Sequence, residues 1–558
     1  MLCVASALVA LRGVAGVRTV LPVGPVGGPG SLAAWGVFGS GGPAHTDIAQ
    51  GRLGDCYYLA VLAALAHEHP ALVEEVFVDR GLERRGVYTM RFAVNGEQVR
   101  VAVDDLVPTD SAGKFFFAQP GSSGAVWPVL LEKGFAKIMG SYKGTSGGIA
   151  YLAIKALTQA PMDWVQPEKE GAEQMWAKLL GARARRWPIT ASSTNNAVGV
   201  AAPHEFAVLE TAADYEGQGR AVRLYNPWGT SNKYRGALAT DRTRGDYWLT
   251  FGEFMETFDM VSFARIQTGY ALSSARVPSG APAALEFSMA GDAPFSVQLE
   301  WAGKGFLAEG CQKPRPSVIL LVARKERPQE YWSNVAPRGH ASFSNARVDV
   351  PGGADDYLVY SSTEFDVPGI DKVVVNAYAA ERVDFVLIKP GHPDEVLKAM
   401  LNMTCAEVMW TRPSGDRHVF ASSPERHRAG PAWVERQSGR VLWFNGTRWR
   451  IAPSFQADRS ELVAGFGGAA ELSCADQERA RFDGCAAVVW GGLGRDVTFE
   501  RRKDFQGGPA WQAGGPPWLL WWSSSGWRIS PSAESPELQY RLGGRQALRC
   551  ARALATEA

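Results

Sequence analysis

The last third of the chain contains an internal repeat, which requires that one folding unit occurs at least twice. Three Trp-containing motifs recur 78 positions later, from 430 to 508, from 442 to 520 and from 449 to 527. Self-similarity at a fixed period is typical of tandem structural modules. We predict two small Trp-rich β modules, module 1 at 402–455 and module 2 at 482–535. The paired motifs are Gly430-Pro431-Ala432-Trp433 with Gly508-Pro509-Ala510-Trp511, Leu442-Trp443 with Leu520-Trp521, and Trp449-Arg450-Ile451 with Trp527-Arg528-Ile529.

The repeated tryptophans have two explanations. Exposed at equivalent positions, they could form a recognition surface for a protein or a glycan. Buried, they would supply the core of units that contain few other large apolar residues, which is the commoner use of tryptophan.

The region before the repeats alternates apolar and polar residues in short runs. Examples within 283–395 are Phe295–Leu299 and Asp356–Tyr360, and turn residues separate the runs. This pattern indicates an antiparallel β-sandwich. The small, Pro-containing stretch from Ser273 to Pro282 is typical of a linker.

Length and composition exclude some classes of protein. A chain of 558 residues is too long for one hydrophobic core, so several domains are expected. Its 58 basic and 57 acidic side chains give no electrostatic reason to expect a nucleic-acid partner. The seven cysteines show neither metal-type spacing nor disulfide density, which suits a reducing, intracellular compartment such as the cytoplasm. Residues 1–30 are interpreted as a dispensable N-terminus, and an organellar location is the alternative if they are a targeting peptide.

Cys56 lies where a Gly-containing loop meets the predicted start of a helix. Apolar residues at helical spacing follow it from Tyr57 to Leu65. Unpaired N–H groups and the positive end of the helix dipole favour a thiolate at such a position. Gln50, on the preceding loop, could turn its amide back to donate to an oxyanion. A buried, inert cysteine is the alternative until a general base is found.

His204 is the best candidate for that base. It opens a strand-like run to Leu209, and a second run, from Ala221 to Tyr225, ends at Asn226-Pro227-Trp228-Gly229. If the two runs pair as a hairpin, Asn226 comes to lie beside His204. Its amide can then fix the imidazole tautomer, and Trp228 can shield that hydrogen bond from water. An ordinary Asn-Pro-Gly turn is the alternative explanation.

The order Gln50, Cys56, His204 and Asn226 resembles that of the calpains, a family of papain-like cysteine proteases. The resemblance covers roughly 31 to 268 and implies an α+β, two-lobed core. A helical lobe at 31–164 carries Cys56 and a β-rich lobe at 165–270 carries His204 and Asn226. Further matching motifs are Val103–Pro108, Trp127–Lys137, Gly140-Ser141-Tyr142, Ser146-Gly147-Gly148, Gly245–Phe251 and Phe254.

The resemblance implies a cysteine endopeptidase that makes limited cuts in protein substrates through an acyl-enzyme. Cys56 is the implied nucleophile, His204 the base, and Asn226 the residue that orients it. Gln50 and the Cys56 backbone N–H would hold the oxyanion. Glu205 follows His204 where calpains usually have a small residue, and strand alternation predicts that its carboxylate faces solvent.

The calcium sites of calpains are matched only in part. Asp47 corresponds to an acidic ligand before the cysteine loop, but its partner position is Leu152, which cannot coordinate a hard cation. Asp241 and Asp246 lie near positions of a second site, where Arg244 brings the wrong charge. Calcium is therefore the only cofactor considered, and we expect weak or absent calcium activation.

Beyond the core, 283–395 resembles the C2-like sandwich of calpains. It lacks a dense acidic loop, so peripheral membrane contact through it is only an open alternative. No EF-hand loop occurs, and a heterodimer with a small subunit is not implied. Two other functions stay open: a calpain-derived, non-catalytic interaction scaffold, and a transglutaminase-like acyltransferase on a papain fold.

Overall fold

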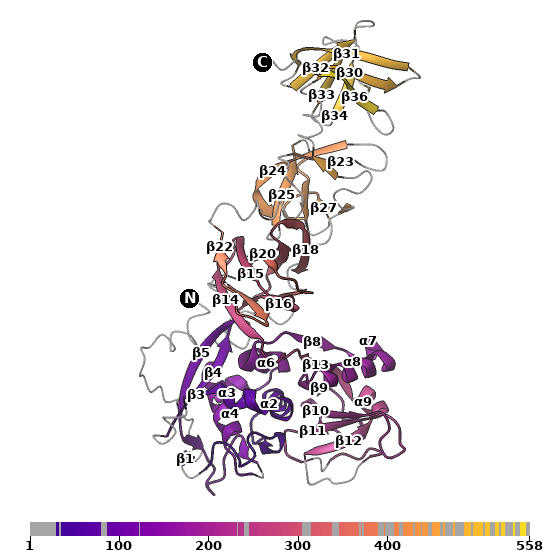
Figure 1. Cartoon of the computed structure of the whole chain (residues 1–558). Coiled ribbons are helices and arrows are strands. Elements are labelled where there is room, and N and C mark those ends of the chain that lie inside the picture. The colour runs from indigo at the N-terminus through magenta and orange to yellow at the C-terminus, as the bar shows by residue number, and fades with distance from the viewer. Residues whose placement is uncertain are drawn as a thin grey trace.

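The chain folds into a two-lobed unit followed by a row of β domains, as a computed structural model shows (Figure 1). Residues 1–28, with most of the predicted N-terminal segment, lie outside the described residues. In the part of the chain that is described, no helix is both long and apolar enough to cross a membrane. The described residues are 29–32, 35–79, 86–121, 123–230, 233–238, 245–303, 314–336, 345–367, 370, 373–388, 396, 407–411, 417–427, 430–436, 438–444, 449–457, 461–463, 472–474, 485–492, 495–505, 508–513, 519–523, 526–530, 540–541 and 547–553.

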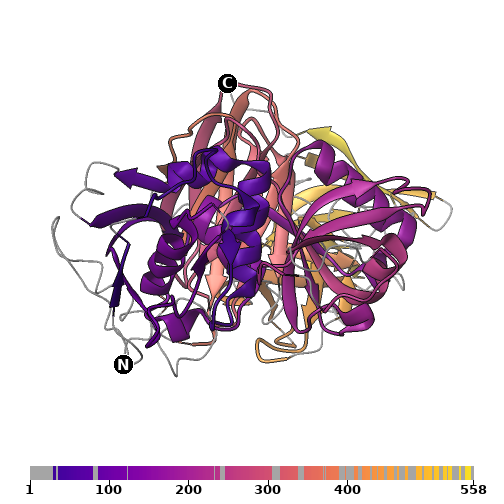
Figure 2. The same cartoon turned by 90° about the horizontal axis from the view of Figure 1, so that it is seen from below.

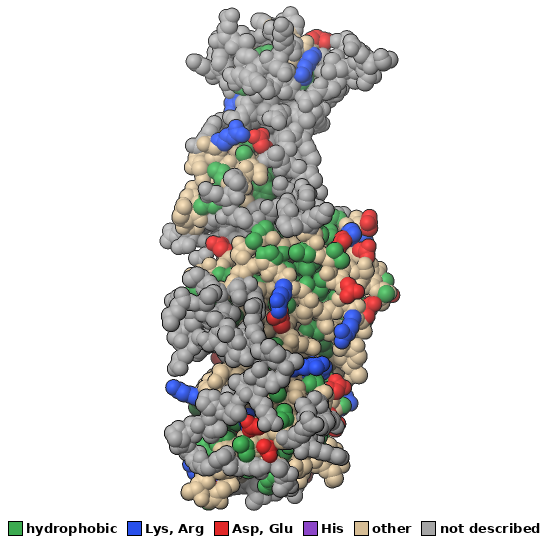
Figure 3. All heavy atoms as spheres, turned by 90° about the vertical axis from the view of Figure 1, so that its left-hand side faces the viewer, with side chains coloured by type: hydrophobic (Ala, Val, Ile, Leu, Met, Phe, Trp, Pro, Cys, Tyr) green, Lys and Arg blue, Asp and Glu red, His purple; other side chains and the backbone are tan. Residues whose placement is uncertain are grey.

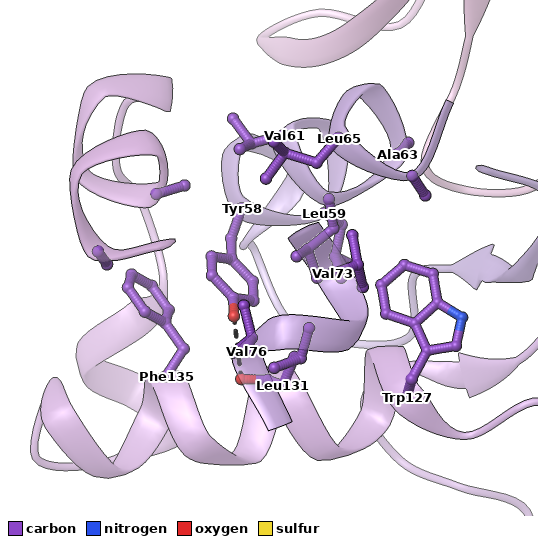
Figure 4. Packing of buried hydrophobic residues seen from close by; sticks show 14 of the residues in the cluster. Tyr58, Leu59, Val61, Ala63, Leu65, Val73, Val76, Trp127, Leu131 and Phe135 are labelled. Atoms are coloured by element: carbon purple, nitrogen blue, oxygen red, sulfur yellow. Dashed lines mark hydrogen bonds between the residues drawn. The ribbon is translucent and has the colours of Figure 1, made fainter. Parts of the chain in front are cut away.

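The helical lobe is built around α2 (Cys56–Glu68), which begins at the predicted residue. Every residue from Tyr57 to Ala66 is buried, because the helix is apolar on all sides and has neighbours on all sides. Figure 4 shows part of this packing: Tyr58 stacks on Phe135 at 4.1 Å between ring centroids and donates its hydroxyl to the carbonyl of Leu131. The other main elements are α3 (Pro70–Val76), α4 (Trp127–Ile138), α6 (Ala150–Thr158) and the sheet of β3 (Phe77–Asp79), β4 (Val87–Val94) and β5 (Glu97–Asp104).

The second lobe is a six-stranded antiparallel sheet flanked by α8 (Ala172–Ala184) and α9 (Phe251–Thr257). The predicted hairpin is confirmed, since β10 pairs with β11 from Ala207 opposite Tyr225 to Ala212 opposite Ala221. Seen from below, the two lobes lie side by side (Figure 2). The strand order is β12 (Asp246–Thr250), β11 (Ala221–Tyr225), β10 (His204–Ala212), β9 (Ile189–Ser193), β13 (Phe258–Ala264) and β8 (Met162–Val165).

Two further sheets pack face to face after the second lobe. The linker prediction is wrong for 273–277, because β14 (Ala271–Val277) pairs along its whole length with β21 (Val373–Ala379). β14 is an edge strand, where small polar side chains are tolerated. The four-stranded sheet also contains β16 (Phe295–Trp301) and β19 (Asn345–Val350), and the five-stranded sheet has the order β18 (Arg327–Ala336), β17 (Ser317–Arg324), β20 (Asp355–Glu364), β15 (Ala283–Met289) and β22 (Val386–Leu387).

Ion pairs join this pair of sheets to the two lobes, and the pair of Lys155 with Glu300 is buried. Lys155 of α6 contacts Glu300 at 2.5 Å, and Arg265 contacts Asp349 at 2.8 Å.

On the face drawn in Figure 3, acidic and basic side chains are interspersed, so the described part of that face presents no region of a single charge.

The C-terminal part forms two seven-stranded sheets whose strands follow the same neighbour order. Trp410, Trp433, Trp443, Trp511 and Trp521 are each at most 6% exposed. These side chains therefore belong to the hydrophobic cores of the two sheets and do not form an exposed recognition surface. In the first sheet, Trp410 and Trp433 pack with residues of β17 and β20. The first order is β28 (Glu461–Val463), β27 (Trp449–Ala452), β26 (Val441–Phe444), β25 (Gly430–Glu435), β24 (Arg417–His427), β23 (Glu407–Thr411) and β29 (Leu472–Cys474), and the second is β35 (Tyr540–Arg541), β34 (Gly526–Ser530), β33 (Leu519–Ser523), β32 (Gly508–Ala513), β31 (Arg495–Phe505), β30 (Cys485–Gly492) and β36 (Ala547–Ala553).

Candidate active site

Cys56 is the first residue of α2 and is partly buried. The loop before it passes so close to its neighbours that glycine is required: a Cβ at Gly51 would lie 1.8 Å from the carbonyl oxygen of Phe117. Likewise, a Cβ at Gly148 would lie 2.3 Å from the ring of Tyr57. The Gly residues of both sequence motifs therefore allow the backbone to approach the start of α2 closely.

His204 and Asn226 are brought together at one end of the β10–β11 hairpin. His204 Nε2 lies 2.8 Å from Asn226 Oδ1, and that oxygen also accepts the N–H of Trp228 at 3.0 Å. The amide nitrogen of Asn226 donates to the carbonyl of Thr230 at 2.9 Å, which fixes the amide orientation. Nε2 of His204 must then be the protonated nitrogen, so Nδ1 is left as the basic one.

Aromatic rings enclose the His204–Asn226 bond. Trp228 lies over the imidazole with 4.5 Å between ring centroids, and Phe206 meets it edge-on at 4.8 Å. Trp228 itself is 36% exposed, and its role in shielding the hydrogen bond from solvent stays a prediction. Lys233 lies over the Trp228 ring at 5.2 Å.

The thiol lies beside the first residues of β10. The backbone N–H groups of Glu205 and Tyr57 favour the thiolate of Cys56, but burial outweighs them and raises the pKa of Cys56 to about 11. Burial also lowers the pKa of His204 to about 4, against the opposing effect of Asn226. The resting site therefore holds a neutral thiol and a neutral imidazole at physiological pH.

Gln50 directs its side-chain amide into its own loop. Nε2 donates to the carbonyl of Leu53 at 2.6 Å and lies 3.5 Å from Asp55 Oδ1, while Oε1 is buried and has no donor among the residues that the structure describes. The backbone N–H of Gln50 donates to the carbonyl of Pro227 at 2.7 Å, so this loop also contacts the turn that carries Asn226. An oxyanion role for the Gln50 side chain stays a prediction.

Sequence reasoning misplaced one carboxyl group and missed two others. Glu205 is 4% exposed rather than solvated, because β10 is an interior strand whose first residues are covered on both faces. Asp55, which precedes Cys56, and Glu132 are fully buried, and each acts on the pKa of the other. Glu132 directly follows the apolar run from Trp127 to Leu131, and this position in the sequence could have indicated a buried carboxyl group.

Asp47 and Asp246, the described residues among the candidate calcium ligands, are already engaged by other side chains. Asp47 is buried and accepts hydrogen bonds from Ala44 N, Trp127 Nε1 and Ser123 Oγ. Asp246 is ion-paired with Arg223. Asp241 lies outside the described residues, among which no group of three potential ligands converges. These residues do not fit the open oxygen cage that calcium requires, and the effect of calcium stays a prediction.

Comparisons with known proteins agree on one family. The family model described as calpain family cysteine protease matches residues 29–265. A calpain-type cysteine protease of Oryza sativa, ADL1, is 26% identical over 302 residues, covering 49% of this chain and 13% of that protein. Human calpain-9 is 27% identical over 343 residues, covering 55% of this chain and 47% of its own, and the catalytic subunit of bovine calpain-2 is 27% identical over 263 residues, covering 41% and 37%. The chain thus spans less than half the length of these curated relatives.

Proposed function

Residues 29–265 are a calpain family cysteine protease domain, and from this premise we propose that the chain is a cysteine endopeptidase acting through an acyl-enzyme on Cys56. The observation that carries the proposal is the 2.8 Å contact of His204 Nε2 with Asn226 Oδ1, which leaves Nδ1 as the base. The thiol lies close to the backbone N–H of Glu205, the residue that follows His204 on β10. Protein substrates and limited cleavage are part of the proposal.

Because the Cys56 thiol and the His204 imidazole are both neutral at rest, the proton of the thiol must move to the imidazole when substrate binds. His204 Nδ1 takes the proton of Cys56, and the sulfur attacks the peptide carbonyl carbon to give a tetrahedral intermediate. The protonated imidazole then gives this proton to the leaving amine as the C–N bond breaks. Water, deprotonated by the same imidazole, attacks the thioester, and the thiolate leaves and recovers a proton from His204. Asn226 holds the ring in one orientation throughout.

The oxyanion would be held on the α2 side of the site. The N–H of Cys56 belongs to the first turn of α2, where N–H groups have no partner within the helix. The Gln50 amide is adjacent, but to donate to an oxyanion it must first leave the carbonyl of Leu53. Such a rotation would be part of substrate binding.

The proposal is tested with Cys56→Ala and His204→Ala variants and an unfolded protein as substrate. Both variants should fold, as judged by an unchanged thermal transition, and lose hydrolysis by about 10⁴-fold or more. In parallel, a thiol-directed covalent inhibitor should label the wild type at Cys56 alone, with the site read by peptide mass spectrometry. Undiminished turnover in folded Cys56→Ala would refute the assignment. A wild type that neither cleaves nor labels would favour the interaction scaffold.

We also propose that the paired sheets from β14 to β22 are a C2-like sandwich and that the two C-terminal sheets are copies of one module. The shared strand order of the two seven-stranded sheets and the 78-residue offset support the second statement. Each should be expressible on its own as a folded unit, which proton NMR dispersion would test.

A further inference from the structure

Two carboxyl groups from different elements meet directly behind the candidate nucleophile. Asp55 precedes Cys56, and its carbonyl accepts the N–H groups of Tyr58 and Leu59, the first hydrogen bonds of α2. Glu132 lies on α4. Both side chains are at most 1% exposed, and each carboxyl group acts on the pKa of the other. The contact therefore joins the start of α2 to the middle of α4.

The hydrogen-bond donors around Asp55 and Glu132 leave one buried carboxyl oxygen without a partner among the described residues. Both oxygens of Glu132 lie 3.1 Å from the N–H of Ala118, and Asp55 Oδ1 lies 3.5 Å from Gln50 Nε2. Asp55 Oδ2 is buried and has no donor among the described residues. Two buried carboxyl groups can share a hydrogen bond only if one of them is protonated, and the unpartnered Asp55 Oδ2 is an atom that such a proton would satisfy.

No neighbouring cation in the described part of the chain stabilises Asp55 and Glu132 as two carboxylates. The titratable groups that act on Asp55 or Glu132, or are acted on by them, are Cys56 and the phenols of Tyr57, Tyr58 and Tyr142. In the described part of the chain, no Lys, Arg or His side chain is ion-paired with either carboxyl group. Accordingly, burial raises the pKa of Asp55 to about 7 and raises the pKa of Glu132 as well. Adjacent buried carboxyls without a cation retain a proton.

We propose that Asp55 and Glu132 share one proton at neutral pH and together act as a positioning pair for the segment from Gln50 to Cys56. The pair holds the first turn of α2, and with it the sulfur and the Cys56 N–H, at a fixed place relative to α4. Through Asp55 Oδ1 it also holds the Gln50 amide beside the thiol. The shared proton reduces negative charge next to the sulfur, where an ionised Asp55 disfavours the thiolate. The kinetic part of this inference rests on the proposed protease function, and the proton sharing does not.

The first experiment detects the proton without using activity. Infrared difference spectra at neutral pH compare the wild type with an Asp55→Asn/Glu132→Gln double variant. The wild type should show the C=O stretch of a protonated, hydrogen-bonded carboxyl group that the double variant lacks. Glu205→Gln is the matched control, because Glu205 is another buried carboxyl group whose removal should leave this band in place. A difference spectrum that contains only ionised carboxylate bands would overturn the proposal.

The second experiment separates positioning from simple stability. Glu132→Gln keeps a hydrogen-bonded pair, because its amide donates to Asp55, and kcat should stay within about threefold of the wild type. Glu132→Leu removes the pair and should lower kcat by about 10- to 100-fold with little change in KM, since oxyanion contacts form mainly in the transition state. Glu300→Gln is the control: it removes a buried carboxylate paired with Lys155, far along the chain from the site, and should lower stability but not kcat.

Two kinetic outcomes would contradict the positioning role. One is an equal loss of kcat in Glu132→Leu and Glu300→Gln at equal loss of stability. The other is a Glu132→Gln variant as impaired as Glu132→Leu. If the wild type hydrolyses no substrate, the alkylation rate of Cys56 by iodoacetamide replaces kcat in the same series, so failure of the proposed function remains distinguishable from failure of this inference.

Discussion

The two side-chain amides of the candidate active site, Asn226 beside the imidazole and Gln50 on the loop before Cys56, differ in how completely their polar atoms are paired. On the imidazole side, Asn226 uses its Oδ1, its Nδ2 and its backbone N–H, the last donating to Gly245 at 2.8 Å. On the thiol side, Gln50 Oε1 and Asp55 Oδ2 are buried and find no donor in the described part of the chain. A complete network fixes one geometry, whereas an incomplete one leaves room for a proton or a rotation. The base is therefore preorganised, and the adjustable groups lie around the nucleophile.

The largest effect should come from breaking the network on the imidazole side with Asn226→Ala. The imidazole would lose the acceptor that selects its tautomer, and kcat should fall by about 100-fold. Asn226→Asp is the matched control, because it keeps an oxygen beside His204 Nε2 and loses only the donor to Thr230. Steady-state kinetics at several pH values decide the outcome. An Asn226→Ala variant as active as the wild type would mean that the imidazole is oriented by its ring contacts alone.

The sequence predicted those parts of the site that depend on neighbours along the chain. The start of α2 at Cys56 follows from local helix formers, and the meeting of His204 with Asn226 follows from the pairing of two consecutive strands. Periodicity also indicated many strands after the second lobe. These features need only a local pattern and one turn.

Features that depend on distant packing were not predictable in this way. The burial of Glu205 results from elements that cover both faces of an interior strand, which alternation cannot reveal. The Asp55–Glu132 contact joins residues on α4 and ahead of α2, and only the tertiary fold brings them together. The linker expectation failed for a similar reason: the partner of β14 lies about a hundred residues further along the chain.

His204 and Asp55 should lower the free energy of unfolding at opposite ends of the pH range. The pKa of His204 is lowered from 6.5 to about 4, so the folded state binds fewer protons than the unfolded state, and stability is lost as pH falls through this window. The pKa of Asp55 is raised from 3.8 to about 7, so the folded state binds more protons, and stability is lost as pH rises through that window. Each unmatched proton changes the free energy of unfolding by about 1.4 kcal/mol per pH unit.

Urea denaturation from pH about 4 to about 8 can separate these contributions. Relative to the wild type, His204→Gln should gain stability as pH falls, because the group that must stay neutral has been removed. The Asp55→Asn/Glu132→Gln variant should gain stability as pH rises, because it has no proton to lose. Parallel curves for the wild type and both variants would contradict the pKa directions on both sides, and a single parallel curve would contradict that side alone.

The smallest effect should come from calcium, which tests whether the thiol side needs an ion to complete it. Asp47 already accepts three hydrogen bonds, and Asp246 is paired with Arg223, so neither carboxylate has free capacity for a hard cation. Peptide hydrolysis with excess calcium and with chelator should therefore differ by less than about twofold. Asp47→Asn is the control: it weakens the Trp127 and Ala44 hydrogen bonds and should lower the melting temperature without creating calcium dependence. Strong activation by calcium that Asp47→Asn abolishes would show that the hydrogen bonds of Asp47 exchange for an ion, and that the thiol side changes structure more than its resting geometry indicates.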